Sequence, residues 1–268
     1  MLKTLFKYTK IYLMFVKIAV QAHMLYWRNF VICIVVEMFY QGIYLAFFAV
    51  ILSNIKTISG WGQYEIMTLL GIDTLTSELT TAMVIALNTR QIPRMIWSGE
   101  LDLVLVRPIS TLFYMTLGRP YFPSFVSSLT GFVLIYFGIK GMNISLSLLG
   151  ITGSILFFIF GFIIIYSMIV FFSLMTFFFQ DSTVLPRIGE RIAYSFTSRP
   201  HDMFTGFFKI VFFVLLPVVY VSSFSTSSLT RGIDWPYLGL AFSLAIISLK
   251  AIDLVWEKAI KNYSSASS

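Results

Sequence analysis

Long uninterrupted hydrophobic runs dominate the chain, and six of them are long enough to cross a membrane. They cover residues 30–52, 64–88, 111–138, 149–179, 207–225 and 236–256. About 20 apolar residues in an α-helix cross roughly 30 Å of hydrocarbon. Because lipid offers no partner for backbone N–H and C=O groups, and because the runs are continuous rather than alternating, they predict transmembrane helices. Pro120 and Pro123 lie near the start of the third run, where we expect a kink or a segment outside the hydrocarbon.

The 29 residues before the first run follow a different pattern. Their basic side chains fall on one helical stripe: Lys3, Lys7, Lys10, Lys17 and Arg28. Apolar residues such as Phe15 and Val20 fall largely on other faces. This pattern predicts an amphipathic helix over residues 1–29 that lies in the headgroup plane. A basic leader that only orients the protein in the membrane is the alternative. We assign residues 30–263 to the transmembrane domain and residues 264–268 to a disordered tail.

Basic residues are distributed unequally between the two sets of connections. Sixteen flank the termini and the connections 89–110 and 180–206, whereas the other connections hold only Lys56, Lys140 and Arg231. The positive-inside rule therefore predicts that both termini are cytoplasmic. Charged residues make up 12% of the chain, against roughly 25% in soluble domains. The net charge of +7 follows from this asymmetry, so nucleic acid is not expected as a partner.

Motifs for catalysis and for nucleotide binding are missing from the sequence. It contains no G-x-x-x-x-G-K-[ST] loop, no dinucleotide-binding glycine pattern, no G-x-S-x-G elbow and no H-E-x-x-H helix. Cys33, His23 and His201 are the only cysteine and histidines, too few for a structural zinc site. We therefore expect neither an enzyme nor a protein with its own cofactor or metal.

The connection 89–110 is the most distinctive segment. Pro93 and Gly99 divide it, and Pro108 closes it. An apolar patch is flanked by charges: Ile92, Met95 and Ile96 form the patch, and Arg94, Glu100 and Asp102 flank it. The segment predicts a short amphipathic helix along the cytoplasmic surface, with charges available to a docking partner. A plain connecting loop is the alternative.

Several polar residues lie inside the first two predicted spans at helical spacing. They are Glu37 and Gln41 in the first span, and Asp73, Ser77 and Glu78 in the second. Ionisable groups in a membrane are costly and often mark a substrate route. We therefore predict that these residues line a translocation path, and the alternative is that they form hydrogen-bonded contacts between helices.

The string from Ser98 to Ser110, S-G-E-L-D-L-V-L-V-R-P-I-S, resembles the S-G-E-L-D-x-x-L-x-R-P signature of ABC-2-type permeases. The resemblance extends over nearly the whole chain, from a basic leader ending in Trp27-Arg28-Asn29 to a fifth span that contains Pro217. One departure is Phe224-Ser-Thr226, where family members often have a Tyr-Pro pair.

The resemblance implies an all-α fold with six transmembrane helices, an interfacial leader and a coupling helix within residues 91–108, which include Arg107. It also implies short re-entrant helices within residues 222–236. Such a permease pairs with a second one, identical or a sister protein, and with two subunits that bind ATP and Mg²⁺. The hypothesis is thus the permease subunit of an ATP-driven exporter in the bacterial inner membrane. The alternatives are a carrier or channel that works without ATP, and a membrane scaffold.

Overall fold

The computed structural model describes residues 2–54, 57–86, 88–179 and 183–263 and is nearly all helical. The helices are α1 (Leu2–Leu25), α2 (Trp27–Asn54), α3 (Gln63–Thr80), α4 (Ile92–Trp97), α5 (Glu100–Leu105), α6 (Thr111–Leu117), α7 (Phe122–Ser127), α8 (Leu129–Met142), α9 (Leu148–Leu174), α10 (Leu185–Tyr194), α11 (Gly206–Ile210), α12 (Ser225–Thr230) and α13 (Trp235–Asn262). Two short strands, β1 (Thr57–Ile58) and β2 (Trp61–Gly62), pair antiparallel. The predicted tail 264–268 lies outside the described residues.

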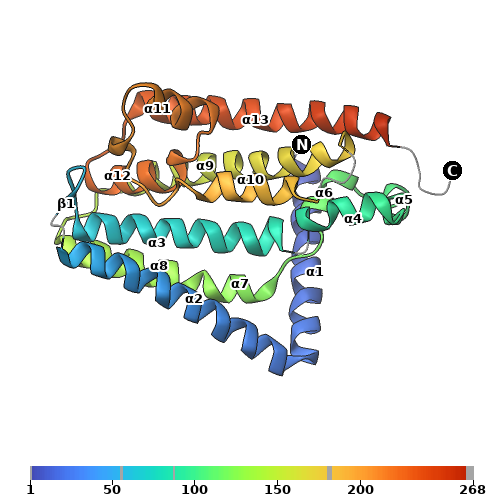
Figure 1. The fold of residues 1–268 in the computed structure, drawn as a ribbon, viewed down its shortest axis with the longest axis horizontal. Coiled ribbons are helices and arrows are strands. Elements are labelled where there is room, and N and C mark those ends of the chain that lie inside the picture. The colour runs from blue at the N-terminus through green and yellow to red at the C-terminus, as the bar shows by residue number, and fades with distance from the viewer. Residues whose placement is uncertain (1, 55–56, 87, 180–182, 264–268) are drawn as a thin grey trace.

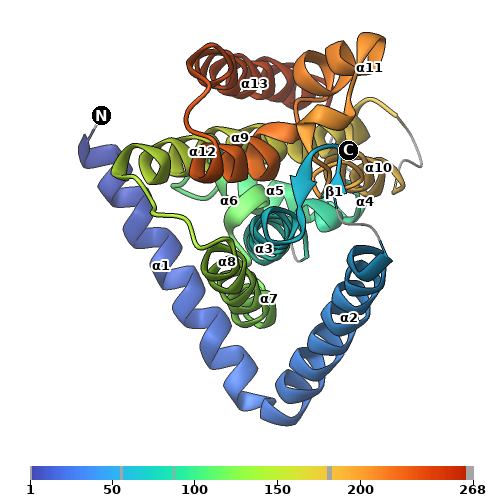
Figure 2. The same ribbon diagram turned by 90° about the vertical axis from the view of Figure 1, so that its left-hand side faces the viewer.

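The long helices run side by side and give the molecule two distinct ends (Figure 1). The β-hairpin lies at one end, which we name the β end, and α4 and α5 lie at the other, the α4–α5 end. Helix α1 runs across the bundle at the α4–α5 end instead of along it (Figure 1). That direction is the one expected of a helix in the headgroup plane. In the view along the bundle, α2 lies at its edge, on the side away from α13 (Figure 2).

Four continuous helical segments are long and apolar enough to cross a membrane, and two bent pairs raise the number to as many as six within the described residues. The continuous segments are Trp27–Ile51, Phe122–Met142, Leu148–Phe177 and Trp235–Asn262. The first bent pair joins α3 and its π-helical last turn, Thr81–Ile85, to the segment Thr89–Trp97 with a bend of 42°. These findings support a multi-pass membrane protein.

The third span starts later than the sequence predicts, at Phe122 instead of residue 111. Residues 111–117 form the separate helix α6, which begins where the Ser110 hydroxyl accepts a hydrogen bond from the Phe113 N–H. The chain then turns through Gly118 and Pro120 before α7 begins. Proline has no N–H to donate and disfavours a helical residue before it, so a straight helix through this point is disrupted.

The fifth passage between the two ends is residues 183–202, not the predicted 207–225. Segment 183–202 runs antiparallel to α3. Successive residues of the segment therefore contact positions progressively closer to the N-terminal end of α3. The contacts, from the α4–α5 end to the β end, are Glu190 with Arg90, Tyr194 with Ser77, Thr197 with Asp73 and Asp202 with Trp61. The sequence prediction failed here because α10 is short and rich in charge, so its hydrophobicity resembles that of a surface connection.

Residues 206–230 form a bent helical hairpin instead of a span. Its two halves meet at an angle of 88° around Pro217. Asp202 before the hairpin and Arg231 after it are joined by an ion pair of 3.1 Å, so both ends of the hairpin lie at the β end. The tip near Leu216 lines a cavity with Ile164 and Leu244, which lie well inside α9 and α13. The hairpin therefore enters the bundle and returns to the same end.

This arrangement also moves two basic residues to the β end. Lys209 lies 5.6 Å from the ring centre of Tyr237 at the start of α13. Arg199 lies between Thr197 and Asp202, in the last part of the passage toward the β end. Among the basic residues that the structure describes, fourteen then remain with the α4–α5 end and four with the β end, so the charge asymmetry is smaller than predicted but keeps its sign.

Glycines allow α3 and α8 to approach closely. A Cβ atom on Gly131 would lie 2.7 Å from the Gly71 carbonyl oxygen and 2.9 Å from the Leu75 nitrogen, both of them backbone atoms. A Cβ on Gly71 would likewise meet the Ile135 nitrogen at 2.8 Å. Close backbone approach through small residues is a common way for helices to associate in lipid.

We expect Gly131→Val to destabilise the protein by about 1–3 kcal/mol, the usual cost of overpacking, because backbone atoms cannot move aside as a side chain can. The measurement is the thermal unfolding midpoint in detergent. Gly239→Val on α13 is the matched control, since a Cβ there meets nothing within 4 Å. Equal midpoints for the two variants would contradict close packing at Gly131.

Candidate functional site

The five residues predicted to line a path lie around one cavity. Glu37 and Gln41 of α2, together with Asp73, Ser77 and Glu78 of α3, line a space of about 430 Å³. The other described lining residues are Tyr40, Tyr44, Thr74, Thr81, Arg90, Tyr194 and Ser198. The chain passage 183–202 thus supplies a third wall that the sequence did not indicate. The path itself stays a prediction, whereas the convergence of its residues is a feature of the fold.

Hydrogen bonds connect α2 and α3 across this cavity. The Gln41 amide donates to Glu78 Oε1 at 2.8 Å, and the Tyr44 hydroxyl donates to Asp73 Oδ2 at 3.1 Å. Residues 37, 41 and 44 follow one another at intervals of four and three, which places them on one face of α2. The predicted contacts between helices are therefore present, and they involve the same residues as the predicted path.

Two residues of the cavity wall have a buried polar atom without a well-formed hydrogen bond in the described part of the chain. Glu78 is 6% exposed, and its Oε2 atom lies beside the Ser124 hydroxyl and has no surface open to the cavity. Thr74 is 2% exposed, and its hydroxyl is also unpaired. Buried polar atoms in native proteins nearly always have partners, so each exception requires an explanation.

An ion pair between Arg90 and Glu190 lies at the side of the cavity toward the α4–α5 end. The guanidinium makes two parallel contacts, Nη2 to Oε2 at 2.6 Å and Nε to Oε1 at 2.9 Å. The sequence did not indicate this pair, because a separation of 100 residues leaves no periodic signal.

The segment predicted as one coupling helix consists of two short helices. Gly99 separates α4 from α5 with φ of 72°, a left-handed conformation that glycine adopts without strain. Ile92 and Met95 are buried in a cluster with Leu101 and Val104. The apolar patch therefore faces its own bundle, and a docking partner could contact only the charged side of the segment.

The remaining residues predicted for coupling lie on or near that charged side. Arg94 is exposed and pairs with Glu100 at 3.7 Å. Asp102 lies beside Tyr263 at the end of α13, and Ile96 is half-buried against the apolar cluster. Arg107 is exposed and its guanidinium lies 4.4 Å from the Tyr114 ring centre. Of the seven residues predicted for coupling, Arg94 and Arg107 are the two that are exposed.

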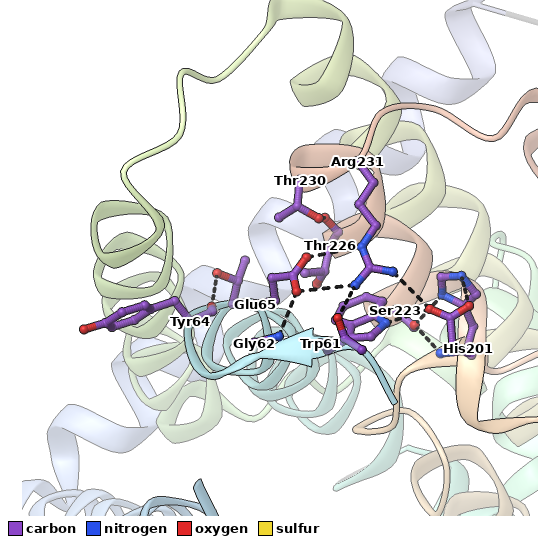
Figure 3. A network of polar contacts seen from close by, with 12 residues as sticks. Trp61, Gly62, Tyr64, Glu65, His201, Ser223, Thr226, Thr230 and Arg231 are labelled. Atoms are coloured by element: carbon purple, nitrogen blue, oxygen red, sulfur yellow. Dashed lines mark hydrogen bonds and ion pairs between the residues drawn. The ribbon is translucent and has the colours of Figure 1, made fainter. Parts of the chain in front are cut away.

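A polar network that the sequence analysis missed closes the β end (Figure 3). Arg231 pairs with Glu65 at 3.2 Å and Asp202 at 3.1 Å, and its guanidinium lies 4.7 Å from the Trp61 ring centre. The fully buried Trp61 donates from Nε1 to Asp202 at 2.8 Å. We name these four residues the β-end network. It joins the start of α3, the end of the 183–202 passage and the exit of the hairpin.

The hairpin is held by a second set of contacts near this network. The His201 N–H donates to the Ser223 hydroxyl at 2.7 Å (Figure 3). The His201 ring stacks on Phe224 with ring centres 4.2 Å apart. Within the described residues, no cluster of three or more histidine, cysteine or acidic side chains could hold a metal ion. His201 therefore acts as a packing and hydrogen-bonding residue here.

Comparisons with known proteins give one match. A family model described as "ABC-2 family transporter protein" matches residues 38–267. No curated protein and no solved structure matches the chain.

Proposed function

The chain belongs to the ABC-2 transporter family, and from this premise we propose that it is the permease subunit of an ATP-driven exporter. The observation that carries the proposal is the position of the polar cavity. It lies in the half of the bundle next to α4 and α5, because its lining reaches Arg90 at that end. The β end is closed over it by the β-end network. This asymmetry fits a permease that loads its cargo from the side of α4 and α5.

We assign the α4–α5 end to the cytoplasm of a bacterial cell with an inner membrane. Fourteen of the eighteen basic residues in the described part of the chain lie with that end, as the positive-inside rule requires of a cytoplasmic side. Helix α1 crosses the bundle there (Figure 1), in the direction expected for an interfacial helix. Both termini are then cytoplasmic, and the hairpin 206–230 enters the membrane from outside.

Two partner subunits that bind ATP and Mg²⁺ would dock on the charged side of α4 and α5, and a second permease, identical or a sister protein, would complete the path. When the ATP-binding subunits move together, α4 moves with them. The Arg90–Glu190 pair transmits this movement to α3 and to the 183–202 passage, since it joins the start of one segment to the other. ATP shifts the equilibrium only if these contacts differ in strength between the two states.

The alternatives predict different behaviour on purification in mild detergent. A carrier or channel would be active without ATP-binding subunits, and a scaffold would move no cargo. Against a scaffold stands a cavity of about 430 Å³ lined by polar side chains, which a purely structural interface would fill.

Reversal of the charges on α5 tests the proposal. We expect Glu100→Lys with Asp102→Lys to leave the complex assembled but to reduce cargo-stimulated ATP turnover about tenfold, because a coupling contribution of about 1.4 kcal/mol would be lost. The fold should survive at Glu100, whose pair with Arg94 is exposed and worth less than about 1 kcal/mol. The measurement is ATP hydrolysis in proteoliposomes with and without cargo.

Glu257→Lys is the control, because it makes one charge reversal of the same kind at an exposed position of α13 near the same end. Normal stimulation in the α5 double variant would remove the coupling role from this segment. Failure of any ATP-binding subunit to co-purify with the unaltered chain would refute the proposal as a whole.

A further inference from the structure

A second cavity lies against α10 at the α4–α5 end, and we name it the α10 cavity. It measures about 470 Å³ and lies between α10 and the end of α3 with the turn that follows it. Its charge is one-sided. Arg90, Arg187 and Arg191 line it, and Glu190 is the one acidic side chain among its described lining residues. Three guanidinium groups thus share one cavity with one carboxylate.

The single carboxylate does not neutralise this charge. Both oxygens of Glu190 are engaged by the Arg90 guanidinium. Arg187 and Arg191 are exposed, and the guanidinium of neither forms an ion pair or a hydrogen bond with a residue that the structure describes. Like charges four residues apart on one helix repel each other. Within the described part of the chain, the α10 cavity therefore holds two positive charges without a counter-ion.

Exposed aliphatic side chains border these two arginines. Val184 is 58% exposed and Ile188 is 38% exposed. Positions 184, 188 and 191 follow one another at intervals of four and three, so they share one face of α10, with Arg187 beside it. A surface with cationic and apolar groups side by side suits a ligand that has an anionic head and hydrocarbon chains. Free phosphate would use the arginines and leave the aliphatic side chains uncovered.

The cavity also lies at the level of a membrane surface. The helical stretch Gln63–Ile85, which runs from the β end toward Arg90, is about 35 Å long at roughly 1.5 Å per residue. This length slightly exceeds the roughly 30 Å of hydrocarbon. Long basic side chains reach toward headgroups from such positions, which explains an exposed arginine but not three arginines around one cavity. Basic pockets between transmembrane helices on the cytoplasmic side are typical binding sites for anionic headgroups.

We propose that the α10 cavity binds the headgroup of an anionic phospholipid, with Arg187 and Arg191 on its phosphate and its hydrocarbon chains against Val184 and Ile188. Arg90 stays paired with Glu190 and forms the inner wall of the site. The proposal goes beyond the exporter proposal and does not depend on it, because it names a lipid that the chain binds in its membrane and names no cargo.

Lipid binding to the delipidated full-length chain in mild detergent, measured by native mass spectrometry, tests the proposal. Dioleoylphosphatidylglycerol carries a net negative charge, and dioleoylphosphatidylcholine has the same chains and phosphate without net charge. We expect the unaltered chain to bind the anionic lipid about tenfold more tightly, because two basic side chains face its headgroup. Arg187→Gln with Arg191→Gln should remove this difference. Glycerol 3-phosphate, which has the anion without the chains, should bind much more weakly than the anionic lipid.

Lys258→Gln with Lys261→Gln is the control, since it removes two positive charges from exposed positions outside the cavity at the same end. Circular dichroism and gel filtration establish that each variant is folded, and Arg187→Gln alone keeps the test decisive if the double variant is not.

Equal affinity of the two lipids for the unaltered chain would overturn the proposal, and so would an unchanged preference in the folded arginine variants. Glycerol 3-phosphate binding as tightly as the anionic lipid would assign the site to a free anion instead. An unchanged lipid preference together with loss of a co-purifying subunit would assign this face to a protein partner, and would likewise overturn the proposal.

Discussion

Arg90→Ala should lower the free energy of unfolding by about 3 kcal/mol, because it leaves the Glu190 carboxylate buried without its partner. The side chain of Glu190 is 8% exposed, whereas that of Arg90 is 49% exposed. We therefore expect the lower end of the range for a broken buried pair, since water reaches one partner. The same variant should lose most cargo transport, because this pair joins the coupling end of α3 to the 183–202 passage.

The measurements are the thermal unfolding midpoint and ATP-dependent cargo uptake into inverted vesicles. Arg94→Ala is the control, because it breaks the neighbouring exposed pair with Glu100, which should cost less than about 1 kcal/mol. Adding Glu190→Gln to Arg90→Ala should recover part of the stability by removing the uncompensated charge, without recovering transport. An Arg90→Ala midpoint as high as that of Arg94→Ala would contradict the buried pair.

Trp61→Ala should cost about 3–5 kcal/mol, the usual loss for a large aromatic side chain removed from a core. Trp61 is fully buried, donates a hydrogen bond to Asp202 and lies beneath the Arg231 guanidinium. Its loss should therefore also loosen the closure of the β end. Trp61→Phe should keep most of the stability, since it removes the hydrogen bond but retains much of the packing.

The closure is measured by labelling a buried position in the hairpin. Thr226 is fully buried, so Thr226→Cys in a Cys33→Ser background should resist a membrane-impermeant maleimide. Labelling should become rapid with Trp61→Ala and stay slow with Trp61→Phe. Slow labelling in a folded Trp61→Ala variant would show that the β end is closed without this network.

Much of the bundle could be predicted from hydrophobic runs. The first, second, fourth and sixth runs correspond to α2, α3, α9 and α13 with small shifts at their ends. The two errors have opposite causes. The apolar hairpin 206–230 resembles a span although it returns to the same end, while the charged helix α10 resembles a loop although it passes through the bundle. Hydrophobicity indicates the surroundings of a segment. It does not indicate whether the chain continues to the opposite end of the bundle or turns back to the same end.

The candidate site was predictable where its residues share one helix. Spacing placed Glu37 with Gln41 and Asp73 with Ser77, and the fold brings both pairs to one cavity. Arg90–Glu190 and the β-end network were not predictable, because their members lie 29 to 166 residues apart. The coupling segment was predictable only in part. Its boundaries followed from Pro93 and Gly99, but which side faces the bundle required the positions of Leu101 and Val104.

The sequence by itself determined that the chain lies in a membrane, that it belongs to the ABC-2 transporters, and which polar side chains share a helical face. These properties depend on local composition and on the spacing of residues, and both can be read directly from the sequence. Only the tertiary structure decided which segment forms the third wall of the cavity, which basic residue neutralises Glu190, and how the β end is closed. Each of these depends on where distant segments meet, and in lipid that is set by backbone approach and polar pairing, which hydrophobicity does not encode.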